Sequence, residues 1–157
     1  MTEIPQEPAE RVRAVVSRVI EALGLDASVE VTENADEIRA TVDGPDDMGR
    51  LIGRHGQTID ALQHIAWRAA FQEREDRKAV VVDAAGYRQR REEALQRQAD
   101  RAASEALRFG RPVELEPMSA AERKTVHNYL ADRTDVETHS EGDEPERRLV
   151  VSPLRVS

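Results

Sequence analysis

Two glycines, Gly53 and Gly56, enclose a basic pair made of Arg54 and His55. Because glycine has no Cβ, a chain of phosphates can approach the peptide amides of such a loop closely. Apolar spacing resumes at Ile59 and predicts a helix directly after the loop, and the N-terminal end of a helix attracts negative charge. The loop therefore combines residues that can hold the backbone of a nucleic acid.

The residues on both sides of this loop extend the predicted site. Apolar side chains before and after it, Leu62 included, are expected to form a groove for bases while the amides and Arg54 meet phosphate. His55 is expected to contribute hydrogen bonds more than charge at neutral pH. Taken alone, two glycines at this spacing are more typical of a helix-loop-helix corner that needs positive φ, but the surrounding residues reverse that interpretation. The predicted nucleic-acid site comprises Arg50, Leu51, Ile52, Gly53, Arg54, His55, Gly56, Gln57 and Ile59.

A second candidate site lies in the last third of the chain. Arg123 and His127 are four residues apart on a predicted helix, so we expect them to share one exposed face, with Lys124 adjacent. Ser119 and Glu122 have the spacing of a capping box, which places the pair one turn inside a helix N-terminus, where anions are favoured. An isolated pair of this kind is more typical of a solvated helix face. Its position, near a strand with two arginines, predicts a second anion site made of Arg123, Lys124, His127, Arg147 and Arg148.

The elements that must position the first site follow from hydrophobic periodicity. Apolar residues three and four apart predict a helix that follows Pro8 and is ended by Gly24, and alternating residues predict a β-hairpin with its turn at 34–36. A short helical turn through Ile52, a helix after Gly56 and a β-branched strand at 78–83 complete the pattern. The expected order is α-β-β-α-α-β.

A long arginine-rich helix, 87–109, is thin in large apolar side chains and is therefore expected to connect two small domains. Its arginines do not all fall on one face; most are expected to solvate the helix, and a subset to extend a nucleic-acid path between the domains. Beyond it we expect a strand at 113–115, a helix with an inward face of Val126, Tyr129 and Leu130, and paired strands at 136–138 and 147–151.

The fold class predicted from these elements is α+β, in two domains joined by a helix. The expected boundaries are an acidic flexible N-terminus at 1–8, a first domain at 9–84, a connecting helix at 85–110 and a small α/β domain at 111–157.

Composition limits the possible functions. The absence of cysteine excludes disulfides and thiolate catalysis, and no stretch approaches the roughly 20 apolar residues that span a bilayer, so we expect a cytoplasmic chain without membrane insertion. The net charge is −8, but it is uneven: residues 86–111 hold 7 arginines against 4 acidic residues, so local charge still allows nucleic-acid binding. Aromatic residues are only 3% of the chain, which argues against stacking platforms.

A catalytic or metal site is not predicted. Asp43, Asp46 and Asp47 form the only tight acidic cluster near the glycine loop, and caps for the short turn before that loop explain them more simply than Mg²⁺ ligands of a nuclease. We therefore expect no enzyme activity, no metal and no cofactor.

Taken together, these motifs resemble the bacterial Jag family of SpoIIIJ-associated, KhpB-like proteins. The residues that carry the resemblance are 48–63, 84–88, 118–127 and 147–153. It implies a type II KH domain followed by an Arg-x-x-x-His domain that binds single-stranded RNA, or single-stranded DNA at the second domain. It also implies a cytoplasmic RNA chaperone or post-transcriptional regulator linked to cell elongation and envelope maintenance, with a small KH-only partner protein.

Two departures from that family bear on function. Many members carry a separate N-terminal domain, and we expect this sequence to lack it because only a short acidic stretch precedes the first predicted helix. His55 stands where a second permanently charged residue is often found, so a weaker or pH-sensitive grip on phosphate is expected.

Two alternative functions remain open at this point. One is a protein-interaction scaffold in which the KH fold forms a homodimer. The other is a metal-dependent nuclease that uses Arg123 and His127 with acidic residues.

Overall fold

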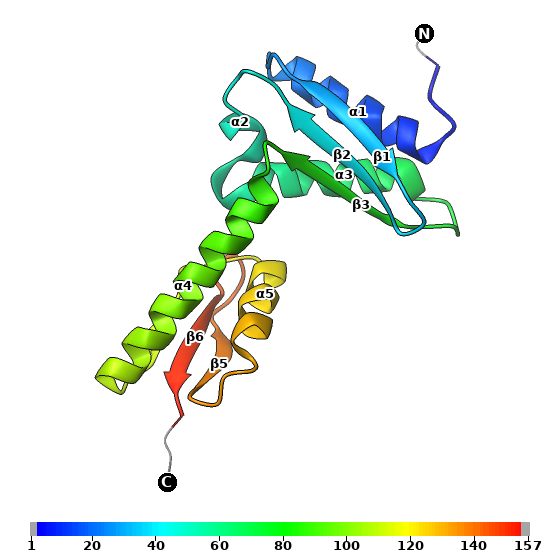
Figure 1. Cartoon of the computed structure of the whole chain (residues 1–157). Coiled ribbons are helices and arrows are strands. Elements are labelled where there is room, and N and C mark those ends of the chain that lie inside the picture. Colours follow the sequence, from blue (N-terminus) through cyan, green and yellow to red (C-terminus); the bar gives the residue numbers. More distant parts are fainter. Residues whose placement is uncertain (1–2, 155–157) are drawn as a thin grey trace. The chain divides into compact units, whose positions relative to one another are not determined.

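The computed structural model describes residues 3–154. The chain divides between Arg88 and Gln89 into two compact units, each with its own hydrophobic core (Figure 1). None of the helices within the described range has both the length and the apolar character needed to span a bilayer.

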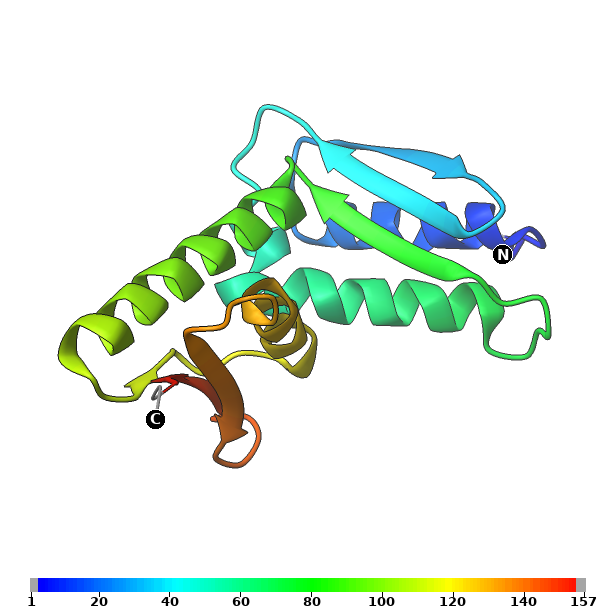
Figure 2. The same ribbon diagram turned by 60° about the horizontal axis from the view of Figure 1, so that its bottom comes forward.

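The first unit contains the elements predicted from the sequence, in the predicted order. They are α1 (Pro8–Ala22), β1 (Ser28–Glu33), β2 (Glu37–Asp43), α2 (Gly49–Ile52), the 3-10 turn η1 (Arg54–Gly56), α3 (Gln57–Phe71) and β3 (Ala79–Ala84). Strand β2 is central, antiparallel to β1 and parallel to β3. Both α1 and α3 pack on the same face of this sheet (Figures 1 and 2).

The alternation of β2 explains why one face of the sheet is covered. Ile38, Ala40 and Val42 are buried beneath the helices, while Thr41 between them faces solvent. On the helix side, α1 and α3 each present apolar residues at three- and four-residue spacing: Val12, Val16 and Ile20 from α1, and Ile59, Leu62 and Ala66 from α3. This core fixes the start of α3, and with it the end of the glycine loop.

The second unit begins near the start of the long helix α4 (Tyr87–Phe109). It continues with β4 (Val113–Glu114), α5 (Ala120–Leu130), β5 (Val136–Glu141) and β6 (Arg148–Pro153). Strand β6 is central in this sheet and antiparallel to both β4 and β5. The predicted pairing of the last two strands is confirmed, with Thr138 opposite Val151.

Most of α4 belongs to the second unit. Its buried face consists of Leu95 and a series of alanines, which share a core with Val126 and Leu130 of α5. The domain boundaries predicted around a connecting helix at 85–110 stay a prediction. Most of the residues that α4 buries belong to the hydrophobic core of the second unit. The inward position expected of Tyr129 is wrong: this side chain is 39% exposed, because its hydroxyl donates to both carboxylate oxygens of Asp100, at 3.0 and 3.1 Å.

Candidate nucleic-acid interface

The backbone of the glycine loop adopts conformations that ordinary residues avoid. Gly53 has φ 74° and ψ 178°, a region that is essentially reserved for glycine. Gly56 is left-handed, with φ 79° and ψ 12°. His55, between them, is also left-handed at φ 54° and ψ 26°, an uncommon conformation in which histidine is among the more frequent residues. The loop therefore makes a sharp bend, with Arg54 exposed and His55 half-buried at its middle.

Packing excludes a side chain at both glycines. A Cβ at Gly53 would overlap the Thr58 hydroxyl and lie 2.9 Å from the Thr58 amide nitrogen. A Cβ at Gly56 would lie 2.7 Å from the hydroxyl oxygen of Tyr87. Both approaches are closer than a real Cβ tolerates, so the bend and its supports fit together only with glycine.

The bend leaves two amide donors available. The N–H of Gly53 donates to the carbonyl of Gly49 at 2.8 Å, and that of Gly56 donates to the carbonyl of Gly53 at 3.3 Å. Between residues 3 and 154, no acceptor lies within hydrogen-bond reach of the N–H groups of Arg54 and His55. These amides stand beside the first turn of α3, whose dipole adds to their attraction for an anion.

Charge at the loop comes from two exposed arginines. Arg50, in α2, and Arg54 both face solvent, and neither forms an ion pair with any acidic residue of the described part of the chain. Gln57 is exposed as well, and His55 is half-buried. The structure thus places the polar members of the predicted site together on one accessible bend.

The apolar members of the predicted site need a correction. Leu51 and Ile59 are 0% exposed and Leu62 is 4% exposed, so they belong to the core of the first unit and do not line an open groove. Ile52 remains half-buried beside the loop. Burial of the other three follows from their helical spacing, because residues that hold α2 and α3 against the sheet cannot also face the solvent.

Arg88 ties the start of α3 to β3. Its Nε donates to the carbonyl of Val82 at 2.8 Å, its Nη1 to Asp60 Oδ1 at 2.8 Å, and its Nη2 to Gln63 Oε1 at 3.0 Å. Gln63 Oε1 also accepts the N–H of Val82 at 3.0 Å. This network keeps the first two turns of α3 in place and so stabilises the bend in front of them.

The acidic cluster before the loop has a structural role. Asp47 Oδ1 accepts the N–H of Gly49 at 2.8 Å, as expected for a residue that holds the turn before α2. Asp46 Oδ2 instead accepts the N–H of Asp26 at 2.7 Å and fastens a different loop. Within residues 3–154 no group of three acidic or histidine side chains is arranged to hold a metal ion.

Three residues predicted for the second site, Arg123, Lys124 and His127, lie on α5, and the expectation for one of them needs a correction. Ser119 is the N-cap, as predicted, and its Oγ accepts the N–H of Glu122 at 3.2 Å. Lys124 and His127 are exposed, but Arg123 is only 8% exposed, so the prediction of a shared exposed face is wrong for Arg123. Its guanidinium is drawn inward because it donates to two acceptors at 2.6 Å each, the carbonyl of Met118 and Oε1 of Glu144.

A cleft of about 390 Å³ nevertheless brings three of the predicted residues together between α5 and β5. It is lined by Ala120, Arg123, Lys124, His127, Thr138, His139, Ser140 and Leu149. His127 Nδ1 and Thr138 Oγ1 are 2.5 Å apart, which orients the imidazole along this cleft. We call it the α5 cleft.

The other two predicted arginines point to different partners. Arg147 Nη1 donates to the carbonyl of Gly142 at 2.7 Å, and Arg148 pairs with Glu114 at 3.1 Å. Sequence reasoning missed Thr138, Ser140 and Glu144. The alternation of β5 could have suggested Thr138 and Ser140, whereas the contact between Glu144 and Arg123 depends on the loop before β6 and has no sequence signal.

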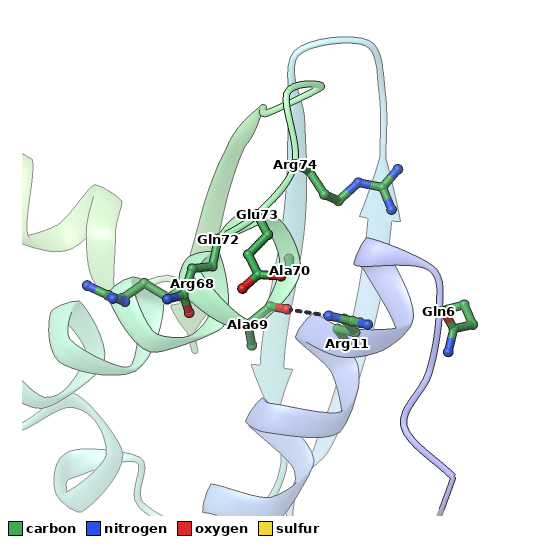
Figure 3. A pocket seen from close by; sticks show the side chains of 8 residues that line it. All are labelled: Gln6, Arg11, Arg68, Ala69, Ala70, Gln72, Glu73 and Arg74. Carbon is green, nitrogen blue, oxygen red and sulfur yellow. Dashed lines mark hydrogen bonds between the residues drawn. The ribbon is translucent and has the colours of Figure 1, made fainter.

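A larger pocket of about 510 Å³ lies at the far end of α3 from the glycine loop (Figure 3). Two of its three arginines are engaged: Arg11 donates to the carbonyls of Pro5 and Ala69, at 2.7 and 3.2 Å, and Arg74 pairs with Asp76 at 2.8 Å, while Arg68 is exposed. The carbonyl end of a helix also repels anions. We therefore assign this pocket to the attachment of the N-terminal segment and not to nucleic acid.

Two family models match the chain. The model described as KhpA/KhpB, KH domain matches residues 9–83, and the model of the domain named for its Arg-x-x-x-His signature matches residues 93–153. These matches confirm the predicted fold class. Both are binding domains and not enzymes, which confirms the expectation of no enzyme activity for these two domains.

Curated proteins of similar sequence carry the same printed name. The RNA-binding protein KhpB of Clostridium symbiosum is 38% identical over 133 residues, which are 85% of this chain and 60% of that protein. The RNA-binding protein KhpB of Bacillus subtilis is 31% identical over 151 residues, 95% of this chain and 72% of that protein. The chain spans 44% of the length of its Streptococcus pneumoniae relative, at 32% identity. These similarities confirm the resemblance found from the motifs.

Proposed function

Because the chain belongs to the KhpB family, which joins a KH domain to an Arg-x-x-x-His domain, we propose that it binds single-stranded RNA. The phosphate backbone binds at the glycine loop of the first unit, and a further stretch binds at the α5 cleft of the second. The ligand of that cleft is RNA, with single-stranded DNA as the other candidate. No bond is made or broken.

One observation carries this proposal. Two adjacent amides, those of Arg54 and His55, lack acceptors within the described residues, at an exposed bend whose glycines let a backbone approach closely. A phosphate oxygen is the acceptor that satisfies adjacent amides, and the Arg54 guanidinium adds a charge-assisted hydrogen bond.

The experiment measures the affinity of the whole chain for a labelled single-stranded RNA over a series of salt concentrations. We expect a linear fall of log K with log salt, with about 0.7 released counterions for each phosphate contacted. The double variant Arg54→Asp/His55→Asp is expected to lose binding at the KH unit. The variant Gln6→Asp/Arg18→Asp introduces the same change of charge at exposed positions away from the loop and is the matched control. Equal affinities of the two variants would reject the glycine loop as the binding site.

The nuclease alternative is tested in the same preparation. RNA incubated with the chain and Mg²⁺ is expected to stay intact, since the acidic cluster near the loop is engaged with backbone amides. Specific cleavage that disappears in His127→Ala would overturn a binding function.

The cellular role that we propose is that of a cytoplasmic RNA chaperone or post-transcriptional regulator linked to cell elongation and envelope maintenance. A small KH-only protein is its proposed partner. Support comes from the family resemblance and from relatives named as RNA-binding proteins. Crosslinking in cells, followed by sequencing of the bound RNA, tests the role, and co-purification with and without ribonuclease tests the partner.

A second candidate function is a scaffold that dimerises through its KH unit. Ile65 favours it, because this large apolar side chain of α3 is 55% exposed beside the exposed His64. Light scattering of the whole chain and of Ile65→Gln tests this function. A monomeric wild-type protein at high concentration excludes it, and a dimer that persists in the double-aspartate variant of the loop supports it.

A further inference from the structure

The outward face of α4 carries a line of arginines. With a rotation of about 100° for each residue of an α-helix, Arg90, Arg97, Arg101 and Arg108 fall within about 40° of one another. They extend over about 27 Å of helix axis, since each residue adds about 1.5 Å. We call these four residues the arginine stripe. The seven arginines of this region do not all share one face, but these four do.

The arginine stripe lies directly opposite the face that α4 buries. The buried residues Leu95, Ala99, Ala102, Ala103 and Ala106 centre about half a turn away from it, and all four arginines of the stripe are exposed. In the described part of the chain, no carboxylate forms an ion pair with Arg97 or Arg101. Their guanidinium groups are therefore available to a ligand from solvent.

Acidic residues border the stripe on both sides. Glu93 and Glu105 are each about 60° from its centre. On the Glu105 side, Arg101 and Glu105 line a cleft of about 280 Å³ between α4 and the β4 segment, together with Glu114 and Glu116. A row of positive charge with negative flanks fits one row of phosphates. A duplex or an anionic membrane surface presents charge over a broader area and would meet these carboxylates as well.

An exposed aromatic residue stands where the stripe ends. Phe109 is 55% exposed, and the guanidinium groups of Arg108 and Arg111 each lie 5.3 Å from the centre of its ring. Arginine planes and aromatic rings are the surfaces on which bases of single-stranded nucleic acid stack. Phosphate contacts along the helix thus lead to a place where a base can stack.

We propose that the arginine stripe, with Phe109 at its C-terminal end, is a third RNA-binding surface, which holds the backbone of a single strand along α4. It rests on the proposed function in that the ligand is the same single-stranded RNA. Its residues are separate from both the glycine loop and the α5 cleft. It lies wholly within the second unit.

The test compares two variants with equal loss of charge. Arg97→Gln/Arg101→Gln removes the centre of the stripe, whereas Arg18→Gln/Arg68→Gln removes two exposed arginines from helices of the first unit. In the whole chain, the stripe variant is expected to bind single-stranded RNA about tenfold more weakly and to lower the salt slope by about 1.4, as two lost phosphate contacts require. The control variant is expected to stay close to wild type on both measures.

A second pair of ligands tests the stacking end. Phe109→Leu is expected to bind an ordinary single strand up to about tenfold more weakly than wild type. Its affinity for the same strand with abasic sites is expected to equal that of wild type, because such sites have no base to stack on the ring. Equal losses for the two strands would overturn the assignment of Phe109.

The outcomes separate this inference from the proposed function. If the stripe variant binds RNA like its control while Arg54→Asp/His55→Asp loses binding, the stripe is rejected and the function stands. If the stripe variant loses affinity while the loop variant keeps it, the stripe stands and the loop is rejected. Capture of an acidic protein by wild type but not by the stripe variant, with RNA affinity unchanged, would also overturn the stripe as an RNA surface.

Discussion

The α-carbon of Gly56 lies against the ring of Tyr87, so that a methyl group on Gly56 would come within 2.7 Å of the tyrosine hydroxyl and 2.8 Å of Cε1. Tyr87 is the first residue of α4, and Gly56 is the last residue of the glycine loop. The contact joins the bend to the segment that follows β3. The shape of the proposed phosphate site therefore depends on a residue 31 positions away in the sequence.

Gly56→Ala is expected to destabilise the first unit by about 2 to 4 kcal/mol, because it combines a left-handed conformation with overpacking against Tyr87. Gly24→Ala is the matched control. Gly24 has φ 67°, and no atom lies within 4 Å of an added Cβ. Gly24→Ala is therefore destabilised only by the left-handed backbone conformation, by about 1 kcal/mol. Urea unfolding monitored by circular dichroism measures both. Equal losses would show that the contact with Tyr87 contributes nothing.

Arg88→Lys is expected to destabilise the first unit by about 2 kcal/mol although it conserves charge. A lysine ammonium cannot reach the carbonyl of Val82, Asp60 and Gln63 together, since the three bonds leave Arg88 from different nitrogens of one planar group. Arg18→Lys, at an exposed position of α1, is the control. A drop in RNA affinity that accompanies the loss of stability in Arg88→Lys, and not in the control, would indicate that this network also positions the loop.

The element order of both units was predictable because their cores are built from regular patterns. Alternation in β2 and the three- and four-residue spacing of α1 and α3 result from burial on one side of each element, so pattern and structure share one cause. The ends set by Gly24 and Gly110 follow from their positive φ.

The side-chain environment of the sites was less predictable. Spacing placed Leu51 beside the loop, but only the fold shows that it points into the core. Likewise, Arg123 and His127 share a helix face by spacing, and Glu144, from a distant loop, decides that Arg123 is turned inward. Contacts between residues far apart in the sequence leave no periodic signal, and they determine which members of a motif are accessible.

The pKa of Tyr129 is raised above its ordinary value of 10.0, first because its hydroxyl donates to the carboxylate of Asp100, and further by burial and by the negative charge of Asp100. The protonated tyrosine is the form that the folded state favours. Its contribution to stability is thus fully present below the ordinary pKa and is lost as the pH rises through the higher folded value. This pair links α4 to α5 within the second unit.

Asp100→Asn is therefore expected to lower the pKa of Tyr129 towards its ordinary value. Tyrosinate absorbance followed during an alkaline titration measures the shift, and Tyr129→Phe identifies which of the two tyrosines of the chain gives the signal. An unchanged titration in Asp100→Asn would contradict the hydrogen bond between Tyr129 and Asp100.

Glu144→Gln is expected to increase the affinity of the second unit for RNA several-fold. Oε1 of Glu144 occupies Nη2 of Arg123 at 2.6 Å, so a phosphate that enters the α5 cleft must compete with this carboxylate and also meets its negative charge. A neutral amide keeps the hydrogen bond but weakens the competition, because hydrogen bonds to ionised groups are roughly twice as strong as neutral ones.

Glu146→Gln gives the matched control, since it removes the same charge from an exposed residue of the same loop. RNA titrations of both variants in the Arg54→Asp/His55→Asp background isolate the second unit from the glycine loop. If both variants bind more tightly to the same extent, the gain is a general effect of charge, and Arg123 is a structural residue that holds Met118 and the loop before β6. A gain confined to Glu144→Gln, abolished by Arg123→Met, would place phosphate on Arg123 itself.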